Sequence, residues 1–155
     1  MATYNGTAES NLRQDDAWCY LADLRSTKEW DPSVVAARLV RGEPGEVGSR
    51  YELEVSFAGR TVTLPYETVE SERPRRVVFE AQTGSISVHD EATVWELAAG
   101  SGVSWKASLR PQGIRRLLDP VLQLAFGRLG RRAEEGLRER LAAAASREER
   151  IGSAP

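Results

Sequence analysis

Hydrophobic and polar residues alternate along most of the chain between Ser33 and Leu109, a pattern typical of β-strands with one buried face. The clearest alternation lies in Gly48–Phe57, where one face carries Tyr51, Leu53, Val55 and Phe57. Glycine- and proline-containing turns separate the segments. We therefore expect seven strands, at Thr3–Leu12, Val34–Val40, Gly48–Phe57, Thr61–Glu70, Arg76–Gln82, Ser87–Leu97 and Val103–Arg110.

Helical patterns lie on either side of this strand-rich block. Two short helices are predicted between the first two strands, at Gln14–Arg25 and at Thr27–Trp30, and the second ends because Pro32 disfavours helical geometry in the residue before it. A long amphipathic helix begins at Asp119, which suits an N-cap, and continues to about Ala145. Short loops between consecutive strands favour an antiparallel meander, so the predicted fold class is α+β.

Composition narrows the classes of protein to consider. A chain of 155 residues with 41% hydrophobic and 28% charged residues is typical of one globular domain. A net charge of −2 gives no general reason to bind nucleic acid. A single cysteine, no recognisable signal peptide and no long apolar run lead us to expect a cytoplasmic protein without integral membrane association. The sequence does not decide between a monomer and a homodimer.

Several segments, in order along the chain, resemble the polyketide cyclase/dehydrase and lipid-transport-like group of the START-like (SRPBCC) superfamily. The similarity covers nearly the whole chain, from about Tyr4 to Leu141. It is carried by Ala17–Leu24, Glu29–Val35, Pro44–Tyr51, Tyr66–Val77, Gly102–Ala107 and Leu117–Pro120.

The resemblance implies a helix-grip fold, in which a curved seven-stranded antiparallel sheet wraps around the C-terminal helix and leaves an apolar cavity between them. We expect residues 1–146 to form a single START-like ligand-binding domain and residues 147–155 a flexible tail. Members of the superfamily bind lipids, sterols or polyketides, and a minority catalyse cyclisation, aromatisation or dehydration. One fold with many functions does not by itself choose among them.

The predicted cavity places large apolar side chains on its walls. Trp30 ends a short helix at a connection that borders the cavity in this family, so its indole is a candidate ligand contact. The full set of candidate ligand-binding residues is Trp30, Tyr51, Leu53, Val55, Phe57, Phe79, His89, Trp95, Trp105, Leu118, Leu122 and Phe126.

His89 is the only histidine of the chain, and it is the first candidate for acid–base chemistry. If Trp95 points into the grip, alternation along the strand would turn Glu91 and His89 inward as well, as a general base with its orienting carboxylate. Side chains two residues apart need not touch, and a bulge near Asp90 would reverse the alternation. One histidine and one cysteine cannot form a zinc site of the usual kind, and we expect neither a metal nor a cofactor.

The sequence thus favours a protein that binds a hydrophobic small molecule, such as a lipid, a polyketide or another aromatic or isoprenoid compound, in an internal cavity. Two alternatives stay open. The first is a polyketide cyclase, aromatase or dehydratase that uses polar cavity residues such as His89. The second is a protein-interaction module whose cavity is filled by its own side chains.

Overall fold

The computed structural model describes the backbone of residues 1–57, 59–84, 86–112 and 119–152. Along the C-terminal helix, side chains are described at 127, 128, 130–144 and 146. The predicted helical turn at Ile114–Leu118 and the candidate residue Leu118 lie outside the described residues, as do the side chains of Leu122 and Phe126.

Seven antiparallel strands form one sheet in the order β1-β7-β6-β5-β4-β3-β2. Strands β2 to β7 therefore pair in chain order as the predicted meander, and β1 pairs with β7. The strands are β1 (Ala2–Ser10), β2 (Val34–Arg41), β3 (Arg50–Phe57), β4 (Arg60–Glu72), β5 (Arg76–Gln82), β6 (Ile86–Leu97) and β7 (Gly100–Pro111).

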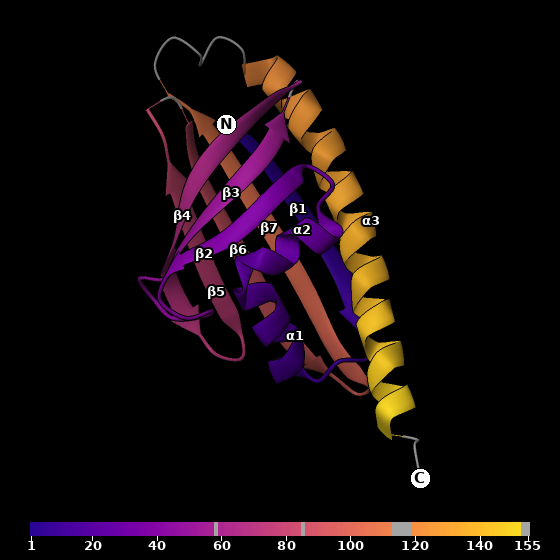
Figure 1. Cartoon of the computed structure of the whole chain (residues 1–155). Helices are drawn as coiled ribbons and strands as arrows, with labels where there is room; N and C mark the ends of the chain where they lie inside the picture. Colours follow the sequence, from indigo (N-terminus) through magenta and orange to yellow (C-terminus); the bar gives the residue numbers. More distant parts are fainter. Residues whose placement is uncertain (58, 85, 113–118, 153–155) are drawn as a thin grey trace.

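Helical segments connect β1 to β2, as predicted, and a long helix ends the fold (Figure 1). The first predicted helix is shorter than expected, because it ends at Ala22 and a 3₁₀ turn follows. The last helix extends past the expected end at Ala145. The helical elements are α1 (Gln14–Ala22), η1 (Leu24–Ser26), α2 (Thr27–Trp30) and α3 (Asp119–Gly152). The α+β fold with two short helices and a long closing helix is thereby confirmed.

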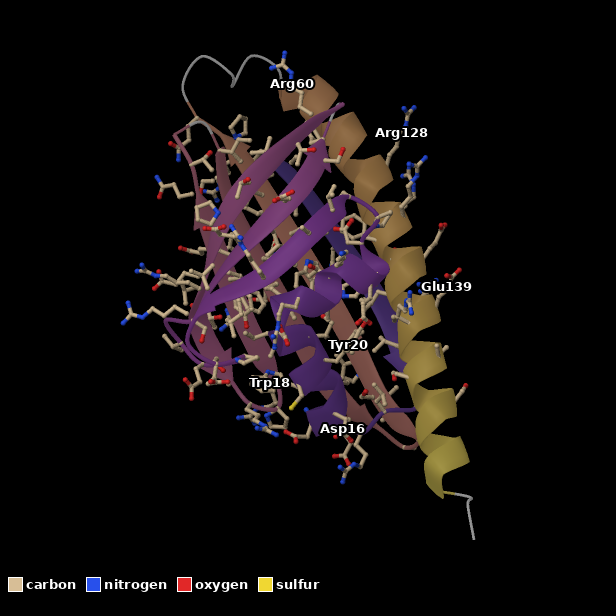
Figure 2. The ribbon with its side chains drawn as sticks, in the orientation of Figure 1. Asp16, Trp18, Tyr20, Arg60, Arg128 and Glu139 are labelled. Carbon is tan, nitrogen blue, oxygen red and sulfur yellow. The ribbon has the colours of Figure 1, made fainter. Side chains whose placement is uncertain are left out.

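Helix α1 is fastened to the sheet by Trp18, which is 4% exposed. Its Nε1 donates a hydrogen bond to the carbonyl oxygen of Arg76 on β5 (3.3 Å), and the guanidinium of Arg73 lies 5.5 Å from the ring centroid. Figure 2 shows Trp18 on one side of α1 and Tyr20 on the side that faces α3. These contacts hold α1 against the start of β5.

Helix α3 runs beside β1 along one edge of the molecule, with Arg128 and Glu139 projecting away from it (Figures 1 and 2). The Tyr4 hydroxyl donates to Oε2 of Glu134 (2.7 Å), and Nη2 of Arg138 donates to the carbonyl oxygen of Thr7 (3.0 Å). Ala133, Leu137 and Leu141 form the buried stripe of the helix. The predicted amphipathic stripe of α3 is thus confirmed over this part of the helix. None of the described helices is long and apolar enough to cross a membrane.

Candidate functional site

Four aromatic side chains from four different elements form a continuous chain of ring contacts inside the fold. Trp30 of α2 meets Trp105 of β7 edge-on, with ring centroids 5.1 Å apart. Trp105 stacks on Phe79 of β5 at 6.2 Å, and Phe79 meets Tyr51 of β3 edge-on at 6.3 Å. All four are almost completely buried. Together they give the interior an aromatic wall that crosses the concave face of the sheet.

A carboxyl group lies on the same face. Asp90 of β6 is the cross-strand neighbour of Phe79 and is only 7% exposed. Its Oδ2 accepts a hydrogen bond from the hydroxyl of Tyr66 on β4 (3.1 Å), so the two side chains meet across the intervening strand. Its Oδ1 has no hydrogen-bond partner among the described residues.

The environment of Asp90 favours the protonated form of its carboxyl. Burial raises the pKa of Asp90 from its ordinary value of 3.8 to about 7; the hydrogen bond from Tyr66 opposes this rise, and the negative charge of Asp31 adds to it. Burial, together with the charge of Asp90, also raises the pKa of Tyr66 well above its ordinary value. A carboxyl with such a pKa can gain or lose a proton near neutrality.

The connection after α2 contributes further polar groups. Oδ1 of Asp31 accepts hydrogen bonds from the backbone nitrogen and the hydroxyl of Ser33 (2.8 and 2.7 Å), which fixes the carboxylate. Burial raises the pKa of Asp31, while the bonds from Ser33 lower it. The neighbouring Trp30 is 4% exposed, and its indole N–H has no partner in the described part of the chain.

Buried polar atoms without a partner are uncommon, because leaving one unpaired costs free energy. Here an unpaired acceptor, Oδ1 of Asp90, and an unpaired donor, Nε1 of Trp30, occur in one aromatic-lined interior. The hydroxyl of Thr68, the neighbour of Phe79 on the other side, is a third such atom. Apolar walls with a few polar groups are the usual composition of a small-molecule site.

A surface groove of about 370 Å³ lies between α2 and α3. Trp30 and Asp31 contribute to its lining, so the residues that border the interior also border this groove. Its remaining lining residues are Lys28, Glu29, Pro32, Arg132, Glu135, Gly136 and Glu139.

Most described members of the predicted ligand-binding set lie on the inner face. Trp30, Tyr51, Leu53, Phe79 and Trp105 are buried. Val55 and Phe57, further along β3, are half-buried. Their contact with a ligand stays a prediction.

The predicted orientation of β6 is wrong. Val88, Asp90, Ala92 and Val94 are the buried residues of this strand, so the residues between them face outward. His89 is exposed, and its Nδ1 lies 3.1 Å from Oε1 of Glu80.

The same reversal places Glu91 and Trp95 on the outer face. Glu91 accepts hydrogen bonds from Nε and Nη2 of Arg76 (2.9 and 2.8 Å). Trp95 is 39% exposed and packs over its cross-strand neighbour Gly102, where a Cβ atom would come within 2.1 Å of the indole. The apolar character of Trp95 suggested the wrong face, because an aromatic ring over a glycine is sheltered without entering the core.

Sequence reasoning missed Asp90 and its partner Tyr66 as site residues. A usable indication was present, since Asp90 interrupts an alternating apolar series of Val88, Ala92 and Val94. A carboxyl group at a core position of a strand conflicts with its surroundings, and such conflicts concentrate at functional sites. Among the residues that the structure describes, no group of three or more His, Cys, Asp or Glu side chains is arranged to hold a metal ion.

Comparison with known proteins gives a family match over most of the chain. Residues 1–142 match the family model described as "Polyketide cyclase / dehydrase and lipid transport". No curated protein matches the sequence.

Solved structures with a similar fold include three that align over almost their whole length. The Zhui aromatase/cyclase from Streptomyces sp. R1128 shares 13% identity at a TM-score of 0.75, over 99% of this chain and 98% of that one. A START superfamily protein from Mycobacterium smegmatis shares 10% identity at a TM-score of 0.74, over 91% and 97%. A protein from Thermus thermophilus shares 17% identity at a TM-score of 0.75, over 92% and 99%. At these identities the likeness shows the fold alone.

Proposed function

The chain belongs to the polyketide cyclase/dehydrase and lipid transport family, and from this premise we propose that it binds a hydrophobic small molecule between its sheet and its helices. The fold is typical of proteins that bind hydrophobic ligands and of polyketide cyclases. The observation that carries the proposal is the aromatic chain of Trp30, Trp105, Phe79 and Tyr51 beside buried polar atoms that lack partners.

Removal of apolar surface from water supplies the driving force for such binding, at about 25 cal/mol per Å². Flat aromatic rings are suited to pack against a ligand built from rings or from an isoprenoid chain. The few polar groups fix how the ligand is oriented. Trp30 and Asp31 border the groove between α2 and α3, and we assign that groove as the entrance.

Native mass spectrometry of the purified protein is the first test. We expect a stoichiometric adduct that is released on denaturation and can be identified as a hydrophobic compound. The purified protein should also bind the neutral fluorescent probe N-phenyl-1-naphthylamine. A protein without adduct that also fails to bind the probe would contradict the proposal and favour an interaction module with a filled interior.

The same substitution on the two faces of the sheet supplies a matched test of the site. Trp105→Leu removes an indole from the aromatic chain, whereas Trp95→Leu removes one from the outer face. We expect the first variant to weaken binding of the probe by about tenfold or more, and the second to leave it within about twofold of the unchanged protein. Equal effects of the two substitutions, measured by fluorescence titration, would show that the probe does not bind inside the fold.

A second candidate function is catalysis of the cyclase or dehydratase type, and one observation favours it. The carboxyl of Asp90 has a pKa of about 7 in an aromatic interior, which suits a general acid or base at neutral pH. On a polyketide-like substrate, Asp90→Asn is expected to lower kcat by at least about a hundredfold while binding persists. Unchanged turnover by this variant would exclude Asp90 as the catalytic group.

A further inference from the structure

Asp90 is held in an asymmetric way by its surroundings. One carboxyl oxygen, Oδ2, accepts the hydrogen bond from Tyr66, and the other, Oδ1, is buried without a partner in the described part of the chain. The hydroxyl of Tyr66 thus fixes the side chain through one oxygen, and the second oxygen is buried and unpaired. An acceptor in this position is costly unless another group completes its hydrogen bonding.

The neighbouring polar groups do not complete it. Asp31 is itself an acceptor, and its Oδ1 is already bonded to Ser33. The indole N–H of Trp30 is a donor, but it makes no hydrogen bond either. The hydroxyl of Thr68, which can also donate, has no partner in the described part of the chain either. The interior therefore contains donors and an acceptor that the described side chains leave unpaired, and a bound molecule with its own polar group could pair with them.

The charges of the site restrict the chemistry of that bound molecule. Two carboxyl groups, Asp90 and Asp31, influence one another electrostatically. An anionic ligand group would be repelled by both of them. A neutral hydroxyl group, in contrast, can donate to Oδ1 of Asp90 while its oxygen remains free to accept a bond from another donor.

We propose that the ligand of this protein is a hydroxylated, ring-containing hydrophobic molecule whose hydroxyl group donates a hydrogen bond to Oδ1 of Asp90. This inference rests on the proposed function and adds the class of ligand to it. Asp90 then acts as the residue that selects a hydroxylated ligand over an otherwise equal apolar one. Tyr66 acts as a positioning residue, because it holds the carboxyl group through the opposite oxygen.

A pair of probes that differ only in the hydroxyl proton tests the proposal. 2-Naphthol carries the hydroxyl group, and 2-methoxynaphthalene replaces its proton by a methyl group. At about pH 8 a phenolic hydroxyl is still neutral, since phenols titrate at about 10. We expect the unchanged protein to bind 2-naphthol about tenfold more tightly than 2-methoxynaphthalene, as measured by calorimetric titration.

Substitutions at Asp90 should remove this preference. In Asp90→Leu, both probes are expected to bind with similar affinity, because the side chain no longer carries an acceptor for the hydroxyl group of 2-naphthol. Asp90→Asn preserves the shape of the side chain and replaces the leucine variant in this test if that variant does not fold. It should reduce the preference for 2-naphthol over 2-methoxynaphthalene to about threefold or less. The matched control is Glu91→Gln on the outer face, which should keep the full preference.

The pH dependence of the preference gives an independent readout. Burial raises the pKa of Asp90 to about 7, the hydrogen bond from Tyr66 opposes the rise, and the charge of Asp31 adds to it. As the pH falls from about 8 to about 5.5, Asp90 therefore gains a proton and can then donate to the ether oxygen of 2-methoxynaphthalene. The preference should therefore shrink in the unchanged protein and stay constant in Asp90→Asn.

The outcomes separate the inference from the proposed function. Similar affinity of the unchanged protein for the two probes, or a preference that survives in Asp90→Leu, would overturn the role of Asp90 while leaving hydrophobic binding in place. If neither naphthalene probe binds and N-phenyl-1-naphthylamine also fails to bind, the proposed function fails, and this inference fails with it.

Discussion

Asp90 shows how a single residue can conflict with the pattern of its strand. Its neighbours on the inner face of β6 are apolar, and its carboxyl group is buried among them. An ionised carboxylate in such a place loses its hydration, which is why burial is the main cause of its raised pKa. The buried carboxyl group of Asp90 therefore lowers the free energy of unfolding at neutral pH.

The loss of stability can be measured through its dependence on pH. The folded protein holds the proton of Asp90 up to a pH of about 7, whereas the unfolded chain releases it near 3.8. Between these values the unfolded state binds fewer protons, so this residue lowers the free energy of unfolding as the pH rises, by at most about 4 kcal/mol.

Asp90→Asn cannot ionise and should escape this effect. We expect its stability relative to the unchanged protein to increase from about pH 4 to pH 7 and to level off above, by about 2–4 kcal/mol in total. Urea unfolding at a series of pH values measures this difference. Glu91→Gln, on the outer face, should show no such increase; a flat difference for Asp90→Asn as well would mean that the carboxyl group is hydrated in the folded state.

At the scale of elements, the position of α3 depends on glycines that allow close approach. A Cβ atom at Gly136 would lie 2.0 Å from the backbone oxygen of Trp30, and one at Gly130 would lie 2.0 Å from the ring of Tyr4. Gly127, one turn before Gly130, has no described atom within 4 Å of such a Cβ. The helix therefore contains glycines of two kinds, and only one kind is explained by packing against α2 and β1.

Substitution of these glycines by alanine should have opposite effects. Gly127→Ala is expected to stabilise the protein by up to about 1 kcal/mol, because alanine favours the helix. Gly136→Ala gains the same propensity, but it must push α3 away from the backbone of α2, and we expect a net destabilisation of about 1–3 kcal/mol. Chemical denaturation of both variants provides the measurement. Stabilisation by Gly136→Ala would show that α2 and α3 do not need this close approach.

At the scale of the whole molecule, the sequence was sufficient to predict the architecture but not the site. Alternation in segments such as Gly48–Phe57 and the regular stripe of α3 led to the correct sheet and closing helix, since both patterns reflect burial directly. The orientation of β6 was predicted wrongly, because the large apolar side chain of Trp95 indicated the inner face more strongly than the smaller Val88, Ala92 and Val94. Because side chains alternate along a strand, assigning one residue to the wrong face reverses all the others. The pairing of Asp90 with Tyr66 joins β6 to β4, and no local pattern encodes such a contact.

Ligand binding should stabilise the molecule as a whole. A ligand present at a hundredfold excess over its Kd adds about 2.7 kcal/mol to the free energy of unfolding, which for a domain of this size raises Tm by about 5–10 °C. We expect 2-naphthol to produce such a rise in the unchanged protein and in Trp95→Leu, and a much smaller one in Trp105→Leu at the same concentration. Thermal unfolding followed by circular dichroism measures the rise. A rise of equal size in all three proteins would point to binding outside the aromatic chain.

The place of β1 in the sheet has a consequence for how the chain acquires its structure. Strands β2 to β7 can assemble from successive hairpins, each a local event, whereas Ala2 of β1 pairs with Leu109 of β7, and Tyr4 bonds to Glu134 beyond it. Contacts between such distant segments form slowly, because a long loop must close first. During synthesis, β1 leaves the ribosome before the remainder of the sheet and stays unpaired until β7, the last strand, has been made. Until it docks, β7 offers an open edge to any neighbouring chain.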